Sequence, residues 1–196
     1  MDGQTITFCG GWKSISIITK KEPGGGRLGL EEEKMKKTNL LDYLDKTIEK
    51  TITDYDVALD WDTKNHTIEI IVRLFAENKA HLEIDDAQGV VSEEEIIEFE
   101  DGILLFNPQK SHFDEKDYLA VIPYEGKKGI AKSVFDALIE YMNEVLAQGQ
   151  SDLLDFLDAD DETAVFELNW DNQQLAKLVE EKQQNETDVY LPYPSY

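Results

Sequence analysis

Residues 55–75 read YDVALDWDTKNHTIEIIVRLF, and this stretch decides the fold. Up to residue 62 apolar residues alternate with Asp and Ala, which predicts a half-buried strand with one acidic face. Asp62-Thr63-Lys64-Asn65 has the composition of a turn. Residues 67–75 are apolar on nearly both sides, which predicts a central strand. Two strands joined by a short turn therefore form the centre of the predicted fold.

Further elements are expected on both sides of this pair. An N-cap at Thr38-Asn39 followed by apolar residues at helical spacing predicts an amphipathic helix before it. Alternation over residues 80–85 predicts a third strand after it. The Asp101-Gly102 dipeptide between two apolar runs predicts a hairpin. The predicted hairpin strands cover 96–99 and 103–106, and another predicted strand covers 118–122 and stops at Pro123.

The last third of the chain is predicted to be mainly helical. The longest helix is expected over 130–147, with Gly149 as its C-terminal stop. A short helix follows over 151–157, and residues 164–170 alternate as a strand. Asp171 and Gln174 form a capping-box pattern for a final helix.

This order of elements predicts an α+β domain. Strands follow strands without intervening helices, so the sheet is expected to be largely antiparallel and packed by helices in a single domain. We assign the domain to residues 35–182 and a polar, then Tyr- and Pro-rich, tail to 183–196. The tail docks on its own domain, docks on a neighbour or stays loose; the sequence leaves the three open.

Residues 1–34 differ in composition from the rest. They contain five acidic and five basic residues, so the chain totals of 42 and 19 leave 37 acidic and 14 basic residues after them. The whole formal charge of −23 therefore lies in residues 35–196. Glu and Lys codons consist almost wholly of purines. The Glu31-Glu32-Glu33-Lys34 run just before Met35 therefore resembles a bacterial ribosome-binding site that has been translated in frame. We expect residues 1–34 to be a non-native or disordered leader.

The charge and composition of the chain argue against several classes of function. A charge of −23 argues against direct binding of nucleic acid, which needs clustered cations. It argues equally against docking on an anionic membrane, and no apolar run approaches the ~20 residues of a membrane span. With 41% hydrophobic residues among 196, the chain can bury a core. A cytoplasmic location is expected.

Gly126-Lys127-Lys128-Gly129-Ile130-Ala131-Lys132-Ser133 resembles a phosphate-binding loop, because it ends in Lys-Ser between a strand and a helix. Ala131 replaces the last glycine, however, and no parallel βαβ pattern surrounds the segment. A Gly-rich turn before a helix explains the same residues and is preferred.

No other motif predicts a catalytic, cofactor-binding or metal-binding residue, and no cofactor is expected. The acidic loop with Asp158, Asp160, Asp161 and Glu162 lacks the Gly and Glu that a calcium-binding loop needs at Thr163 and Asn169. His66, His81 and His112 share no ligand spacing. Cys9, the single cysteine, lies in the leader. Carboxylate pairs are inevitable in so acidic a chain and carry no information.

Three motifs make the chain resemble the uncharacterised bacterial domain-of-unknown-function family 3013, found in lactic-acid bacteria and their Gram-positive relatives. They are Asn39-Leu40-Leu41-Asp42-Tyr43-Leu44, Asp60-Trp61-Asp62 and Phe166-Glu167-Leu168-Asn169-Trp170. The resemblance covers residues 35 to about 183 and implies a small cytoplasmic bacterial protein. It implies no activity, substrate or site.

Three functions remain open. The first is a protein-binding or adaptor-like module without catalytic activity. The second is a small nucleotide-binding protein or enzyme that uses the Gly126–Ser133 turn. The third is an acidic nucleic-acid mimic that binds a basic partner, which requires carboxylates spaced like phosphates over one face. The sequence does not give the oligomeric state.

Overall fold

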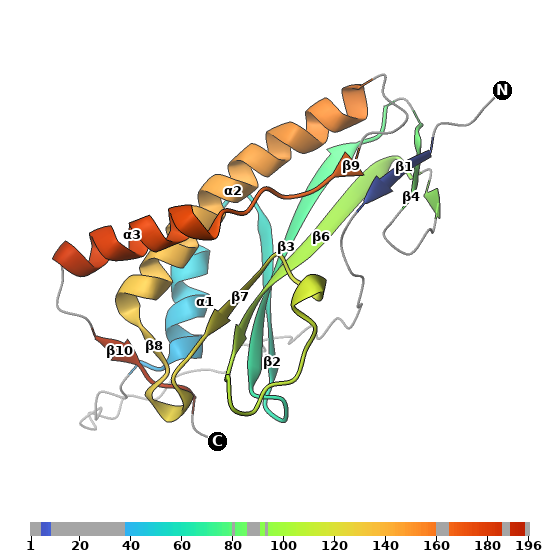
Figure 1. The fold of residues 1–196 in the computed structure, drawn as a ribbon. Helices are drawn as coiled ribbons and strands as arrows, with labels where there is room; N and C mark the ends of the chain where they lie inside the picture. The colour runs from blue at the N-terminus through green and yellow to red at the C-terminus, as the bar shows by residue number, and fades with distance from the viewer. Residues whose placement is uncertain are drawn as a thin grey trace, which may run out of the picture.

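The computed structural model describes residues 5–8, 38–79, 81–85, 91–92, 94–159, 165–185 and 189–194. Three α-helices, two short 3-10 helices (Glu115–Asp117 and Gly126–Lys128) and ten strands make up this part of the chain (Figure 1). The α-helices are α1 (Leu40–Thr51), α2 (Lys132–Asp158) and α3 (Asn172–Asn185). The strands are β1 (Thr5–Phe8), β2 (Asp56–Asp62), β3 (Thr67–Glu77), β4 (Glu83–Asp85), β5 (Val91–Ser92), β6 (Ile96–Phe106), β7 (Ala120–Pro123), β8 (Ile130–Ala131), β9 (Val165–Phe166) and β10 (Tyr190–Leu191).

The main sheet has the order β2-β3-β6-β7. Its central pair, β3 and β6, is antiparallel over eleven residues, from Thr67 opposite Phe106 to Glu77 opposite Ile96. β2 pairs antiparallel with β3, and β7 pairs parallel with β6. The predicted α+β fold, with a largely antiparallel sheet packed by helices, is confirmed.

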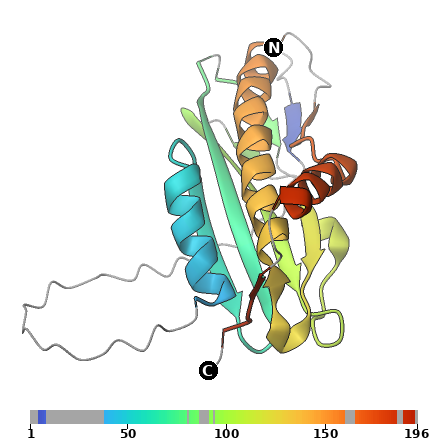
Figure 2. The same cartoon turned by 90° about the vertical axis from the view of Figure 1, so that its left-hand side faces the viewer.

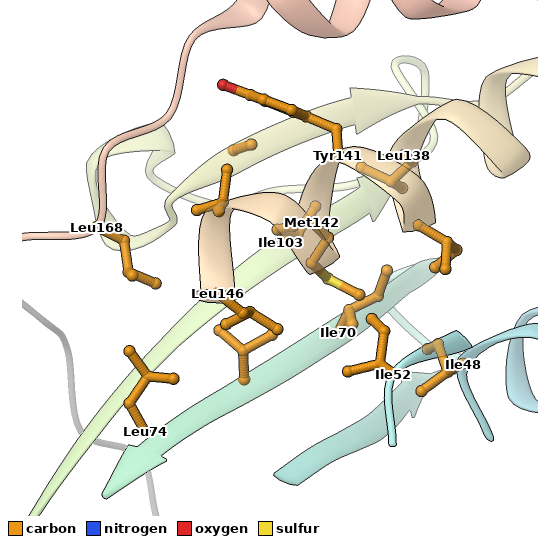
Figure 3. Packing of buried hydrophobic residues seen from close by; sticks show 14 of the residues in the cluster. Ile48, Ile52, Ile70, Leu74, Ile103, Leu138, Tyr141, Met142, Leu146 and Leu168 are labelled. Atoms are coloured by element: carbon orange, nitrogen blue, oxygen red, sulfur yellow. The ribbon is translucent and has the colours of Figure 1, made fainter. Parts of the chain in front are cut away.

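One face of the main sheet is covered by helices. Figure 2 shows α1 and α2 in front of the strands, with α3 against α2. The even-numbered residues of β3 point into this layer, where Ile68, Ile70, Val72 and Leu74 are all buried. Figure 3 shows how Leu138, Met142 and Leu146 of α2 lie over β3 and β6. Burying such side chains stabilises the fold by about 1.5–3 kcal/mol each.

Two helix starts follow directly from the sequence. The Asn39 side chain accepts a hydrogen bond from the Asp42 N–H at 2.9 Å and caps α1. The Asp171 carboxylate accepts one from the Gln173 N–H at 2.7 Å at the start of α3. The predicted N-cap at Asn39 is confirmed. Asp171 caps α3, but the predicted capping box with Gln174 does not form, because the Asp171 N–H donates to the Tyr141 hydroxyl at 2.9 Å. The predicted start of the longest helix shifts, because Ile130 and Ala131 form β8 and α2 begins at Lys132.

The predicted hairpin at Asp101-Gly102 is wrong. β6 runs without a break from Ile96 to Phe106, because β3 offers eleven continuous pairing positions. Gly102 makes room for the Glu69 side chain of β3 instead of turning the chain. A Cβ atom there would lie 2.7 Å from Oε1 of Glu69, whose side chain lies over the glycine.

The predicted helix stop at Gly149 is also wrong, and residues 151–157 are not a separate helix. α2 is 27 residues long and passes through Gly149 without a break. The glycine is buried, and a Cβ atom would lie 2.2 Å from Cδ2 of Leu168 and 3.3 Å from Cδ1 of Leu74. Close packing between α2 and the segment before α3 therefore explains this glycine.

Two smaller sheets complete the description. β5, β4, β1 and β9 form one of them, in which β1 pairs parallel with both β4 and β9. β1 is the part of residues 1–34 that the structure describes; the rest of the predicted leader lies outside the described residues. The other small sheet is β8 with β10, which brings the end of the chain onto the start of α2.

We expect Gly149→Ala to lower the free energy of unfolding by about 1–2 kcal/mol, because overpacking a core outweighs the better helix propensity of alanine. The measurement is urea unfolding. Gln148→Ala on the exposed side of the same turn is the control and should stay within about 0.5 kcal/mol of the wild type. A stabilised Gly149→Ala variant would contradict the packing role of the glycine.

Candidate functional site

The face of the main sheet turned away from α1 and α2 is the candidate site, and we call it the open face. Successive side chains of a strand point to opposite faces of the sheet, so every second residue of each strand belongs to the open face. They are Asp56, Ala58 and Asp60 of β2, Glu69, Ile71, Arg73 and Phe75 of β3, and Ile96, Glu98, Glu100, Gly102 and Leu104 of β6. The sequence predicted the acidic side of β2; the register shows that β3 and β6 continue it.

One end of the open face is covered by the segment that joins β6 to β7. Figure 1 shows this segment on the side of the sheet opposite α1. The Phe113 ring lies 4.8 Å from that of Phe106 and 6.0 Å from that of Tyr118. Leu104 is buried at this end. The described residues leave the remainder of the open face, toward Phe75, in contact with solvent.

Arg73 is the centre of the charged part of this face. Its Nε lies 2.7 Å from Glu100 and 3.2 Å from Glu98, and its Nη1 lies 3.2 Å from Asp56. The carboxylates come from the strands on either side, so one guanidinium bridges β2, β3 and β6. Arg73 is the only basic residue in the sequences of these strands. The cluster therefore keeps an excess of two negative charges.

A second group of carboxylates lies further along the face. Asp60 of β2 and Glu69 of β3 are directly opposite each other, an arrangement that costs stability for like charges. Burial raises the pKa of Tyr118, and the negative charges of Glu69, Asp117 and Asp60 raise it further. The electrostatic potential of the open face is thus negative along most of its length.

Two large apolar side chains are exposed to solvent at the uncovered end of the open face. Phe75 is 42% exposed and Ile96 is 49% exposed. The register places Ile96 two residues from Glu98, the partner of Phe75, so the two apolar side chains are diagonal neighbours on adjacent strands. The acidic face therefore has an apolar end.

The carboxyl group of Asp101 in the main sheet has a strongly raised pKa. It lies on β6 facing the helical layer, where burial raises its pKa to about 6. Backbone N–H groups of Gly102 and Leu119 donate to it and oppose the shift, while the charges of Glu69 and Glu167 add to it. Asp101 is therefore ionised at neutral pH at a cost in stability.

The Gly126–Ser133 turn is folded against the end of the chain. The Lys128 Nζ lies 2.7 Å from Glu125 Oε2 and 3.6 Å from the centre of the Tyr190 ring. The Lys132 Nζ lies 2.5 Å from Asp136, whose hydrogen bond raises the pKa of the lysine. A Cβ atom on Gly129 would lie 1.8 Å from the Leu191 carbonyl oxygen. These contacts fill the turn with protein groups and give the nucleotide hypothesis no support.

The histidines and acidic residues singled out in the sequence are scattered. His66 lies in the turn between β2 and β3, His81 precedes β4, and His112 lies between β6 and β7. Asp158 ends α2, while 160–162, Thr163 and Cys9 lie outside the described residues. Among the described residues, no three His, Cys, Asp or Glu side chains gather in a way that could hold a metal ion.

No helix in the described ranges combines the length and apolar character needed to cross a membrane.

Comparisons with known proteins agree with the resemblance seen in the sequence. The family model described as "Protein of unknown function (DUF3013)" matches residues 35–195. The chain is also similar to a solved structure, a conserved protein of unknown function from Enterococcus faecalis, with 48% identity and a TM-score of 0.74. The similarity covers 84% of this chain and 100% of that one. No curated protein matches the chain.

We expect Asp101→Asn to stabilise the protein by about 1–3 kcal/mol above pH 6, because a raised carboxyl pKa makes the ionised form costly in the folded state. The amide oxygen of Asn still accepts from the same N–H groups. Since the pKa of Asp101 is about 6 when folded and 3.8 in the unfolded reference, the gain should shrink between pH 6 and pH 4.

Urea unfolding at several pH values measures this effect. Glu144→Gln, an exposed site on α2, removes the same charge and is the control. A gain in the Asp101 variant that is equal to the control, or independent of pH, would contradict the buried-carboxylate account.

Proposed function

Because this chain belongs to the DUF3013 family of proteins of unknown function, we propose its role from geometry: a cytoplasmic protein-binding module without catalytic activity that docks through its open face. The observation that carries the proposal is the diagonal Phe75–Ile96 pair, exposed beside a network of carboxylates on an ordered sheet. The partner is expected to present an apolar patch bordered by basic residues.

The apolar end supplies the affinity in this proposal. Large apolar side chains near the centre of an interface contribute most of the binding energy, and truncating one costs about 1–2 kcal/mol or more. The β3–β6 pairing orders the backbone of Phe75 and Ile96 before binding, so only their side chains lose conformational freedom. The sheet thus presents a preorganised anchor.

The carboxylates supply orientation and speed of association. Asp56, Glu98 and Glu100 surround Arg73, and Asp60 and Glu69 extend the negative surface. Such a field attracts a basic partner and rejects acidic ones, and its effect falls as salt screens it. Arg73 adds a planar donor that is frequent in interface hot spots.

The proposal predicts that the double substitution Phe75→Ser with Ile96→Ser strongly reduces capture of the partner. The full-length chain is the bait in host lysate, washed at low and then moderate salt, with bound proteins quantified by mass spectrometry. Removing both apolar side chains should reduce the amount of partner retained by at least tenfold. This corresponds to a loss of about 1.4 kcal/mol or more in binding free energy.

A matched control is Leu154→Ser with Val165→Ser, which removes two apolar side chains of similar exposure, 48% and 54%, from α2 and β9. It should retain the partner. Equal loss in both double variants would contradict docking through the open face. Capture of basic proteins only, released by moderate salt and unaffected by the Phe75 and Ile96 changes, would favour the acidic mimic instead.

A further inference from the structure

Residues 189–194, which we call the C-terminal strap, lie across the start of both α1 and α2 (Figures 1 and 2). Tyr190 and Leu191 pair antiparallel with β8. The first residue of each helix also donates its N–H to the strap: Lys132 to the Val189 carbonyl at 2.8 Å, and Leu40 to the Pro192 carbonyl at 2.9 Å. These N–H groups have no partner within their own helices, so the strap satisfies donors that a helix start leaves open.

Side chains of the strap enter the body of the protein at two positions. Leu191 is buried against the main core. The Tyr193 ring stacks on that of Tyr124 at 4.9 Å and 14°, and its hydroxyl accepts a hydrogen bond from Trp61 Nε1 at 2.7 Å. Backbone pairing combined with two side-chain sites is how proteins commonly recognise an extended peptide.

The groove that receives the strap is built by the domain itself. The Tyr124 hydroxyl donates to the His66 carbonyl at 2.7 Å, which fixes the ring that Tyr193 stacks on. Gly129 has a φ of +80°, and any larger residue would strike the Leu191 carbonyl. The floor of the groove is therefore shaped to let an extended backbone approach closely.

We propose that this groove is a peptide-recognition site for an extended Leu-Pro-Tyr segment of another protein, and that the C-terminal strap is a competing occupant within the same chain. Such a ligand adds a strand to β8, places its leucine in the Leu191 site and stacks its tyrosine on Tyr124. Its carbonyl groups replace those of the strap at the two helix starts. This site is separate from the open face, so the domain has two docking surfaces.

The chemistry of the groove selects the ligand. The helix N–H groups favour carbonyl oxygens, which any extended peptide offers. The leucine site is apolar, whereas the tyrosine site offers the indole N–H of Trp61, which phenylalanine cannot use. Pro192 donates no N–H and fixes the extended backbone between the two anchors. A Leu-Pro-Tyr sequence therefore fits better than an arbitrary apolar peptide.

The test uses the full chain carrying Leu191→Ala and Tyr193→Ala, which weakens the strap and frees the groove. The probe is a fluorescent peptide with the sequence of residues 188–196. We expect saturable binding to this variant that is at least tenfold tighter than to the wild-type chain, whose tethered strap competes at high effective concentration. A peptide with alanine at the same two positions should bind at least tenfold more weakly.

Trp61→Phe and Trp170→Phe, each added to the strap variant, form a matched pair of controls. The first removes the donor to the tyrosine and should weaken peptide binding, whereas Trp170 lies against Tyr141 and should not affect it. A folded strap variant that does not bind the peptide overturns the proposal. Equal binding of the alanine peptide overturns it as well.

Hydrogen exchange on the wild-type chain gives an independent answer should the strap variant fail to fold. Excess peptide should displace the strap and speed exchange of the Leu191 and Tyr193 amides without affecting β3 or β6. Unchanged exchange of those amides overturns the proposal. The Leu191 amide could also become better protected from exchange as the protein concentration rises, with a dimer seen by light scattering. The occupant of the groove would then be a second copy of the chain, and this result also overturns the proposal.

Discussion

The antiparallel pairing of β3 with β6 is the constraint on which the rest of the structure depends. Its eleven consecutive residue pairs fix which side chains face the helices and which face away. Because the side-chain period of a strand is two, a register shift of one residue would move every buried apolar side chain of β3 to the other face. The same pairing sets the positions of β2 and β7, which join it on either side.

The two faces that result have opposite chemistry. The buried face is a continuous apolar layer covered by α2, in which Gly149 lets Leu168 approach closely. The other face carries the Arg73 network and ends in exposed Phe75 and Ile96. Five of the 42 acidic residues lie on this face, and three of them surround one guanidinium. This asymmetry supports a binding role more directly than the composition does.

Much of the fold could be predicted because local patterns agree with it. The alternation of β2 and β3, the caps at Asn39 and Asp171 and the family motifs are local signals. The predictions of a hairpin at Asp101-Gly102 and of a helix end at Gly149 are wrong. A glycine marks a turn or a helix end only where the backbone needs the conformations that glycine allows. Here each glycine instead provides space for a side chain that is distant in sequence. The docking of Tyr193 on Trp61, 132 residues away in sequence, and the perturbed Asp101 depend on tertiary contacts that no sequence window contains.

Native-state hydrogen exchange of the full chain tests the central role of the β3–β6 pair most directly. The account predicts that amides of residues 68–74 and 99–105 exchange slowest and only through global unfolding, because both strands are central and one face is fully buried. Amides of α3, β8 and β10 should exchange earlier. If the amides of α2 stayed protected after those of β3 and β6 had exchanged, the helix and not the strand pair would be the element that the fold depends on.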